Sequence, residues 1–428
     1  MKLDMMHPAD QLIYTMRRIY RNGLTTTSGG NLSILDPSGD LWITPGGIDK
    51  GALTRSDIML VREDGSTEGC HKPSLELQLH QAVYKARPDI RAVLHAHSPA
   101  LMAFSMLRQL PDFSLIPNTR IVCGRVAAAD YAIMGSADLA DKVFEKMSRG
   151  ANSVLMDNHG IIVGAESLAQ AYKIFETLEF AATSELTARR LGNLKKLSED
   201  QIDIARTRAH TRLSEFKPRF RSSNELDLRR EMVMLMRRGL DHQLFYSSQG
   251  TISARVDKNT FLITPFGIDR RDIDEEQLVL VKKGLKEAGK TPSRAVFLHE
   301  LIYHRHPEIQ AIIAAQPPNI MAFTITDRVL DARLMPEPYL LLKELPRAPY
   351  GLNYENPQRT ADLFEGDVSS IILENDGIIT TGKNLTQAFD RLEVAEFTAR
   401  AVVAAGDYES LQALDDDQMA EIDAGFRS

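Results

Sequence analysis

Residues 28–49 read SGGNLSILDPSGDLWITPGGID, and residues 248–269 read SQGTISARVDKNTFLITPFGID. Three further pairs follow in the same order: KPSLELQLH (72–80) with TPSRAVFLH (291–299), AVLHAHSPA (92–100) with AIIAAQPPN (311–319), and DNHGIIV (157–163) with ENDGIIT (374–380). The offset between matched positions changes only from 220 to 217 along the chain. A self-match at one nearly fixed period indicates a tandem repeat, so the chain is an internal duplication of about 220 residues.

Composition places the chain among ordinary globular proteins. Of its 428 residues, 43% are apolar and 25% are charged, which is typical of folded domains. The net charge of −7 argues against nucleic acid or an anionic membrane as a partner. The chain has only two cysteines, no apolar signal-like start and no long apolar run, so we expect a cytoplasmic protein.

The two repeats have the same predicted order of helices and short strands. Each opens with an amphipathic helix, at about 8–22 and 225–238, that ends near Gly23 or Gly239, where glycine suits a left-handed C-cap. Short β-rich runs and further helices follow in the first repeat, which ends on a long helix at 167–191. This order predicts a layered α/β domain for each repeat.

The repeat boundaries give the expected domain organisation. We expect a first domain at 1–195, a charged connector at 196–224 and a second domain at 225–428. Features that both halves keep are assigned to the fold. Features that only the first half keeps are candidates for chemistry.

A candidate metal site comes from two histidine motifs of the first half. His95 and His97 follow an apolar run, and residues two apart in a strand project to the same side of the sheet. A third histidine, His159, lies in a turn between two strand-like runs. Three neutral imidazoles and one open position are the usual arrangement of a catalytic divalent ion. Glu76, on the helix before the strand that carries His95, is a candidate general acid–base.

The second half decides between this interpretation and the alternative of structural histidines with a solvated glutamate. All four groups are missing there together, whereas the apolar pattern around them survives; their counterparts are Ala295, Ala314, Gln316 and Asp376. Separate drift could remove any one group, but joint loss indicates one site that the second copy abandoned. The second domain is therefore expected to lack the metal and acid–base residues.

The same comparison sorts the remaining polar residues. His80 recurs as His299, which favours a structural histidine, whereas Asn31 is replaced by Thr251, which favours a role in ligand binding. Glycine-rich segments at 29–31 and 44–47, with Ser74, could form a cradle of backbone amides and hydroxyls for an anion. Ordinary turn-forming glycines are an equally good interpretation.

Taken together, these motifs resemble the class II aldolase/adducin family. The matching motifs are GNLS (30–33), ITPGGI (43–48), KPSLE (72–76), HAHS (95–98) and NHG (158–160). They occur in the family's order over essentially the whole first repeat. The second repeat is similar to the family in its framework only.

The resemblance implies two α/β/α domains, each with a largely antiparallel central sheet, and a homo-oligomer with active sites at subunit interfaces, either a dimer of tandem chains or larger. It implies that His95, His97 and His159 bind Zn²⁺ or a similar divalent ion and that Glu76 moves protons. It also implies a substrate phosphate surrounded by Asn31, Thr44, Gly46, Gly47 and Ser74.

The chain departs from the family pattern in two places. Leu75 stands where many phosphosugar enzymes of the family have serine, which removes one hydroxyl from the cradle. No tyrosine occurs between residues 101 and 130, where some aldolases of the family carry one. Tyr131 matches a family tyrosine for which packing is at least as good an explanation. These departures weaken a fuculose-type assignment but leave the metal site unchanged.

We therefore expect a metal-dependent aldolase-type lyase that acts, through an enolate or enediolate, on a small sugar or sugar acid that carries a phosphate. An epimerase, decarboxylase or dehydratase on the same scaffold is the first alternative, and a non-catalytic adducin-like interaction protein is the second. The degenerate repeat could also supply a wall to the first site, with Arg270, Arg271 and Arg294 as candidate contacts.

Overall fold

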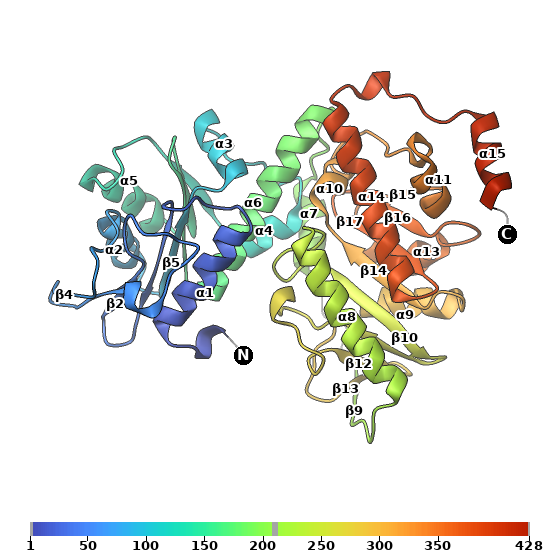
Figure 1. The fold of residues 1–428 in the computed structure, drawn as a ribbon, viewed down its shortest axis with the longest axis horizontal. Helices are drawn as coiled ribbons and strands as arrows, with labels where there is room; N and C mark the ends of the chain where they lie inside the picture. The colour runs from blue at the N-terminus through green and yellow to red at the C-terminus, as the bar shows by residue number, and fades with distance from the viewer. Residues whose placement is uncertain (1–2, 208–212, 427–428) are drawn as a thin grey trace. The chain divides into compact units, whose positions relative to one another are not determined.

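The computed structural model describes residues 3–207 and 213–426, which divide into two compact units (Figure 1). Unit 1 contains residues 3–113 and 118–183, and unit 2 contains residues 114–117, 184–207 and 213–426. The ends of the two predicted domains (1–2 and 427–428) and the middle of the predicted connector (208–212) lie outside the described residues.

Unit 1 is built around one sheet. Its elements, in chain order, are η1 (Leu3–Met5), α1 (Pro8–Arg21), β1 (Asn31–Leu35), β2 (Leu41–Ile43), η2 (Arg55–Asp57), β3 (Met59–Val61), β4 (Thr67–Glu68), α2 (Leu77–Ala86), β5 (Ala92–Ala96), α3 (Pro99–Leu107), α4 (Pro117–Cys123), β6 (Val126–Ala129), α5 (Ala137–Ser148), β7 (Ser153–Met156), β8 (Gly160–Ala165) and α6 (Leu168–Leu191). The long helix predicted at 167–191 is therefore present as α6, whose last residues belong to unit 2.

The strand order of this sheet is β4-β3-β2-β1-β5-β8-β7-β6. Among the described strands of this sheet, only β6 and β7 pair in parallel. The register places Asn31 of β1 opposite His95 of β5, and His95 opposite Ile162 of β8. The two central strand pairs therefore bring three of the motif-bearing segments side by side.

Unit 2 repeats this plan. Its elements are α7 (Glu199–Thr207), β9 (Glu215–Phe216), α8 (Ser223–Asp241), β10 (Thr251–Asp257), β11 (Thr260–Ile263), η3 (Arg270–Asp272), β12 (Val279–Lys282), β13 (Leu285–Glu287), α9 (Val296–Arg305), β14 (Ala311–Ala315), α10 (Pro318–Thr324), η4 (Ala332–Leu334), α11 (Pro336–Leu342), β15 (Arg347–Ala348), α12 (Leu352–Glu355), α13 (Pro357–Asp362), β16 (Ser370–Leu373), β17 (Gly377–Gly382), α14 (Leu385–Ala405), η5 (Tyr408–Ser410) and α15 (Asp416–Phe426). Its strand order is β15-β16-β17-β14-β10-β11-β12-β13-β9.

Both sheets have helices on their two faces, which explains why adjacent residues of the central strands are buried together. Val93 packs with α2 and α5, whereas Leu94, which points to the opposite face, is also fully buried. Ile312 of unit 2 packs with α9 and α13, and α14 contacts β14 and β17. The predicted fold class, two α/β/α domains with largely antiparallel central sheets, is confirmed.

The predicted end of one helix is wrong. Gly23 has a positive φ of 68° just after α1, as expected, but Gly239 lies inside α8, which continues to Asp241. The residue with positive φ after α8 is Gln243, at 60°. Gly239 is required for space instead, because a Cβ there would lie 2.4 Å from the ring of Phe245.

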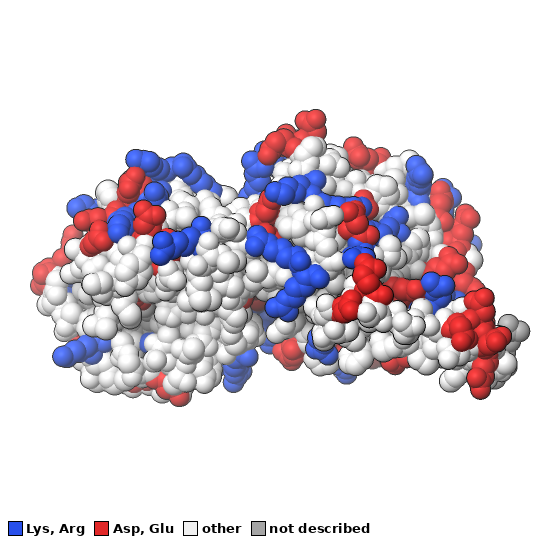
Figure 2. All heavy atoms as spheres, turned by 90° about the horizontal axis from the view of Figure 1, so that it is seen from above, with Lys and Arg blue, Asp and Glu red and all other residues white. Residues whose placement is uncertain are grey.

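Two further observations concern the surface. Within residues 3–207 and 213–426, none of the helices combines the length and the apolar character needed to cross a lipid bilayer. Acidic and basic side chains are interspersed over the face shown in Figure 2.

Candidate metal centre

Three histidines of unit 1 reach one point from two neighbouring strands. His95 lies in β5 and His97 follows that strand, so the two rings project from the same side of the sheet. Because β5 pairs with β8, the turn before β8, which carries His159, lies beside the end of β5. The HxH motif and the NHG motif therefore meet in space.

The distances between the rings suit a single ion. The Nε2 atoms of His95 and His97 are 2.9 Å apart. The ring centroid of His159 lies 4.9 Å from that of His95 and 5.4 Å from that of His97. One nitrogen from each ring lies within 4.8 Å of the others. Nitrogens bound to one tetrahedral ion are roughly 3.3 Å apart, so small side-chain adjustments suffice.

The hydrogen bonding of the rings also fits a divalent ion. His95 Nδ1 lies 2.9 Å from the carbonyl oxygen of Ile161, which makes Nδ1 the protonated nitrogen and leaves the Nε2 lone pair for a metal. Both ring nitrogens of His159 are buried and make no well-aligned hydrogen bond among the described residues, although Glu76 Oε1 lies 2.9 Å from Nε2. Buried polar groups are rarely left unsatisfied, and an ion would supply the missing partner.

Two of the three histidines, His95 and His97, are in the protonation state that metal binding needs. Burial lowers the pKa of His95, and it lowers the pKa of His97 to about 4. Both rings are therefore neutral at physiological pH, and neutral imidazole is the form that coordinates metal. The donor set of unit 1 thus fits a divalent metal ion.

Glu76 precedes α2 and faces the histidines. Its Oε1 lies 2.9 Å from Nε2 of His159, and its Oε2 lies 3.2 Å from Nε2 of His95. The side chain is 4% exposed, and burial alone would raise its pKa. The neighbouring His95 and His159 and the Asn31 amide outweigh this effect, so the pKa of Glu76 is lowered. The result is a buried carboxylate directly beside the candidate metal ligands.

Asn31 and His80 hold this carboxylate in place. Asn31 Nδ2 donates to Glu76 Oε2 at 2.6 Å, and Asn31 Oδ1 bonds with Nε2 of His80. The other ring nitrogen of His80 lies 2.6 Å from the hydroxyl of Ser33. Burial lowers the pKa of His80 to about 3, so its ring stays neutral. His80 therefore lies behind the site and fixes the amide that orients Glu76.

The segments predicted to form an anion cradle lie next to each other. Pro45 and Pro73 form an isolated bridge, and a Cβ on Gly46 would lie 3.6 Å from the Pro73 carbonyl oxygen. Gly47 has a positive φ of 68°, and Ser74 Oγ accepts the amide hydrogen of Glu76 at 3.2 Å.

Two groups of the predicted anion cradle, the Thr44 hydroxyl and the Gly46 amide, already make hydrogen bonds within the fold. The hydroxyl of Thr44 accepts the amide hydrogen of Leu32 at 3.1 Å, and the amide of Gly46 donates to the carbonyl of Lys72 at 3.3 Å. Both contacts recur in the second repeat, where Thr264 accepts from Ile252 and Phe266 donates to Thr291. The loop shape therefore belongs to the fold, and the groups left for a ligand are the hydroxyl hydrogens of Thr44 and Ser74 and the Gly47 backbone.

The supporting role of Glu179, in α6, was not predicted from the sequence. Its carboxylate accepts hydrogen bonds from the Ser98 hydroxyl at 2.7 Å and from the amides of Ala100 and Leu101 at 2.9 and 3.0 Å. Burial raises the pKa of this carboxyl despite these donors. Glu179 fastens the segment directly after His97 to α6. Its counterpart Glu396, an acidic residue in an apolar stretch of the second long helix, was the available signal.

Lys50 was also missed. It is 1% exposed, its ammonium donates to the Pro45 carbonyl, and burial lowers its pKa to about 8. Its counterpart Arg270 is 3% exposed and donates to the carbonyls of Pro265 and Ile268 at 3.0 Å. The predicted substrate-contacting role of Arg270 is therefore wrong, because its guanidinium is buried inside the loop that it supports.

The corresponding point of unit 2 is filled by side chains that bond to one another. Gln316 Nε2 donates to the Asp376 carbonyl at 2.6 Å, and the Tyr246 hydroxyl donates to Gln316 Oε1 at 2.8 Å. Asp376 Oδ2 accepts from Asn353 Nδ2 at 2.9 Å and from the Tyr354 hydroxyl. In the described part of unit 2, no three His, Cys, Asp or Glu side chains form a cluster that could hold an ion.

Comparison with known sequences gives one family for both repeats. The family described as "Class II Aldolase and Adducin N-terminal domain" matches residues 10–186 and 230–403. A 5-deoxy-D-ribulose 1-phosphate aldolase of Bacillus thuringiensis is 33% identical over 45% of this chain and 91% of its own length.

Two other relatives are named for different activities. An L-fuculose phosphate aldolase of Methanococcus maripaludis is 35% identical over 40% of this chain and 92% of its own length. A 3-oxo-tetronate 4-phosphate decarboxylase of Escherichia coli is 34% identical over 38% of this chain and 78% of its own length. The relatives therefore include enzymes that act on phosphorylated sugars or sugar acids by two different reactions.

Proposed function

This chain belongs to the class II aldolase and adducin family, and we propose that its unit 1 is a metal-dependent carbon–carbon lyase for a small phosphorylated sugar or sugar acid. The observation that carries the proposal is the meeting of three imidazoles and one buried carboxylate in unit 1, which has no equivalent in the described part of unit 2. Both aldolase relatives, which are matched over more than nine-tenths of their own length, support the reaction type.

In this proposal His95, His97 and His159 hold the ion, and Zn²⁺ is the first candidate because three neutral imidazoles and an open position suit it. When bound, the ion acts as a Lewis acid that stabilises negative charge on the substrate oxygen. The Ile161 carbonyl keeps the His95 ring in the orientation that this role needs.

Glu76 is proposed to take up or release the substrate proton through its carboxylate oxygens. Its position beside the histidine nitrogens puts it within reach of a group bound in the open position. Asn31 is proposed to orient Glu76 and to border the substrate site, because its amide nitrogen and oxygen are both engaged, with Glu76 and His80.

The substrate phosphate is proposed to lie against the loop of Thr44, Gly46 and Gly47 and the hydroxyl of Ser74. The chain has a net charge of −7, so an anion must be bound by local donors rather than by the overall field. Leu75 lies beside this point and is 77% exposed, so it contributes no hydroxyl.

Glu76→Gln tests the assignment of the base. The substitution keeps the shape of the side chain but removes the basic oxygen, so turnover should fall by about 10²–10⁴-fold. Metal content measured by elemental analysis should stay near that of the wild type. Unchanged turnover would refute the role of Glu76, and loss of metal would show that Glu76 is a ligand instead.

A decarboxylase is the second candidate, because one relative with 34% identity carries that activity. Both reactions break a carbon–carbon bond next to a carbonyl, so the site geometry supports either. The metal-loaded protein should be offered sugar 1-phosphates and phosphorylated keto acids in parallel. Release of an aldehyde identifies the lyase, and release of carbon dioxide identifies the decarboxylase.

We also propose that the protein is a cytoplasmic homo-oligomer. Leu75, Tyr131, Ile133 and Met134 flank the site and are 57–77% exposed, and apolar side chains gathered near a site are typical of a covered surface. Sedimentation analysis of the purified protein tests this. Replacing Ile133 and Met134 by serine should weaken the assembly, and a monomeric wild type would contradict the proposal.

A further inference from the structure

A second group of metal-binding side chains lies in unit 1, outside the histidine site. It consists of Asp57 at the end of η2 and of Cys70 and His71 after β4, and one ligand atom from each lies within 4.8 Å of the others. Asp57 Oδ1 is 2.8 Å from Nε2 of His71. The thiol of Cys70 donates to the carbonyl oxygen of Ser56 at 2.9 Å.

The strand registers identify the matching place in unit 2. Val61 pairs with Thr67 in unit 1, and Val281 pairs with Lys286 in unit 2. Counting on from these pairs, Cys70 matches Gly289 and His71 matches Lys290. Asp57 matches Gln277, and Ser56 matches Glu276. None of the three candidate ligands of unit 1 is therefore kept in unit 2.

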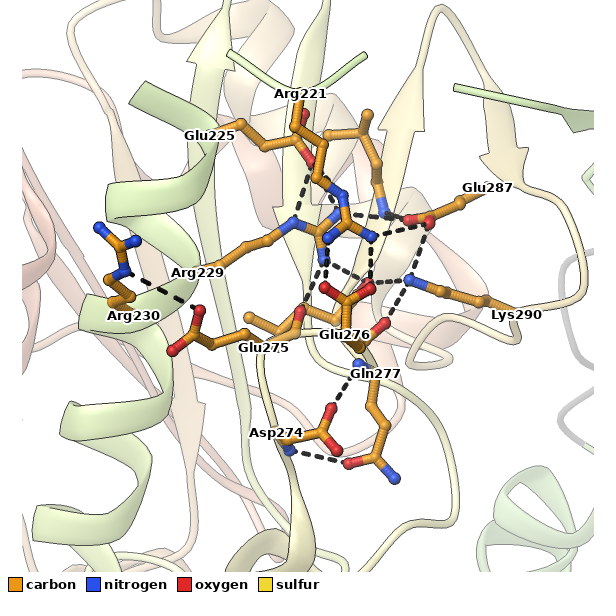
Figure 3. Close-up of polar contacts among 12 residues, drawn as sticks. Arg221, Glu225, Arg229, Arg230, Asp274, Glu275, Glu276, Gln277, Glu287 and Lys290 are labelled. Atoms are coloured by element: carbon orange, nitrogen blue, oxygen red, sulfur yellow. Dashed lines mark hydrogen bonds and ion pairs between the residues drawn. The ribbon is translucent and has the colours of Figure 1, made fainter. Parts of the chain in front are cut away.

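In unit 2 the ammonium group of Lys290 occupies the place that corresponds to Asp57, Cys70 and His71. Figure 3 shows Lys290 reaching back from the loop after β13 towards Glu287 and the segment 276–278. Its ammonium lies 2.8 Å from Glu287 Oε1 and donates to the carbonyls of Glu276 and, at 3.0 Å, Leu278. The ammonium thus joins the loop before α9 to the turn before β12.

Unit 1 makes the same connection without a lysine. The carbonyl of Ser56, which corresponds to that of Glu276, accepts from the Cys70 thiol instead of from an ammonium. A thiol, an imidazole and a carboxylate stand where unit 2 has one cation. We propose that a thiophilic divalent cation, Zn²⁺ or Cd²⁺, binds to Asp57, Cys70 and His71 and takes the place of the Lys290 charge.

The chemistry of the three groups supports this site. Thiolate and imidazole are preferred ligands of Zn²⁺, and three protein ligands leave a fourth position for water. Asp57 is held in place because its Oδ2 accepts the amide hydrogen of Thr54 at 2.8 Å. His71 and Asp57 are partly buried, with side chains 27% and 20% exposed, while Cys70 is exposed and can turn towards an ion.

The site is structural rather than catalytic. Cys70 and His71 lie on the loop that leads into Pro73 and Ser74, the segment directly before Glu76, whereas Asp57 lies in η2. An ion there would fasten this loop to η2, as Lys290 fastens the corresponding loop of unit 2. Because it uses none of the three site histidines, its occupancy can be measured separately from theirs.

The test measures metal bound to the intact protein. The protein is stripped with a chelator, loaded with excess Zn²⁺, freed of unbound metal and analysed for zinc per chain. We expect two ions in the wild type, one in Cys70→Ser, one in His97→Ala and none in the combined variant. The double variant Cys70→Gly/His71→Lys installs the residues of unit 2 and should bind one ion while keeping its thermal stability without zinc.

Co²⁺ loading gives a second measurement. A thiolate-bound Co²⁺ produces charge-transfer absorption in the near ultraviolet, which should appear in the wild type and in His97→Ala but not in Cys70→Ser. One zinc per wild-type chain without this absorption would overturn the proposal. Two zinc ions that persist in Cys70→Ser would overturn it as well, since the second ion would then lie elsewhere.

Discussion

The two units share the same order of eight sheet strands, to which unit 2 adds β9, and their interiors differ at the point where unit 1 carries its histidines. In unit 1 that point holds His95, His97, His159 and Glu76, and in unit 2 it holds a network centred on Asp376. The Ser33–His80 contact has an equivalent in the Ser253–His299 contact of unit 2, at 2.8 Å. The fold therefore tolerates loss of the site, provided that the remaining polar groups find other partners.

The loop beside the histidines of unit 1 is more exposed than the matching loop beside Asp376 of unit 2. In unit 2, α12 carries Asn353 and Tyr354 to Asp376, and Tyr350 is 9% exposed. In unit 1 the matching residue, Tyr131, is 57% exposed and Ile133 is 69% exposed. Closing the abandoned site thus involved a loop as well as the four substituted side chains.

The largest expected effect is a loss of turnover, which is tested by a matched pair of substitutions, one in each unit. His97→Ala removes an imidazole of the candidate metal centre and should lower turnover by more than about 10³-fold, because loss of the ion forfeits several kcal/mol of charge stabilisation. Gln316→Ala, at the matching position of unit 2, should leave turnover unchanged. Steady-state kinetics with elemental analysis checks both. Equal losses in the two variants would show that unit 2 takes part in catalysis.

A smaller loss of kcat is expected when a residue of unit 1 is replaced by its counterpart from unit 2. Asn31→Thr removes the 2.6 Å hydrogen bond to Glu76. A hydrogen bond to a charged group contributes about 1.5–3 kcal/mol, so kcat should fall by about 10–100-fold with the bound metal retained. Asn31→Asp keeps the shape but loses the donor, and it should be at least as impaired. Full activity of Asn31→Thr would show that Glu76 needs no such support.

Unit 2 should respond in stability rather than in activity. Asp376→Ala removes the carboxylate that accepts hydrogen bonds from Asn353 and Tyr354, which should lower the free energy of unfolding of unit 2 by about 1–3 kcal/mol. Denaturant unfolding monitored by circular dichroism measures the change, and the kinetic assay serves as the control. A variant as stable as the wild type would indicate that the network is already hydrated.

The smallest expected effect is on the pH dependence of stability. It concerns the buried carboxyl of Glu396, whose counterpart in unit 1 is Glu179. Burial raises the pKa of Glu396 to about 7, above its ordinary value of 4.5. The folded protein therefore holds a proton that the unfolded chain releases. This contribution to stability is fully present below pH 4.5 and is lost as the pH rises through about 7. Glu396→Gln should show a weaker decline of the melting temperature between pH 5 and pH 8 than the wild type.

Much of the candidate site was predictable because its residues stand in short motifs that the second repeat lacks. Period-two spacing placed His95 and His97 on one side of a strand, and joint loss in unit 2 pointed to Glu76 and His159. Glu179 and Lys50 were missed, because residues that support a site through backbone groups recur in both units and are indistinguishable from the fold.

The sequence by itself determined the duplication, the α/β class and the difference between the halves, because these depend on local patterns and on comparison along one chain. Only the tertiary structure decided what lies around each motif. It showed that Asn31 orients Glu76, that Gly239 makes room for Phe245, and that Asp57 meets Cys70 and His71. Such contacts join residues from separate elements, and their distances are set by strand register and packing rather than by any local pattern.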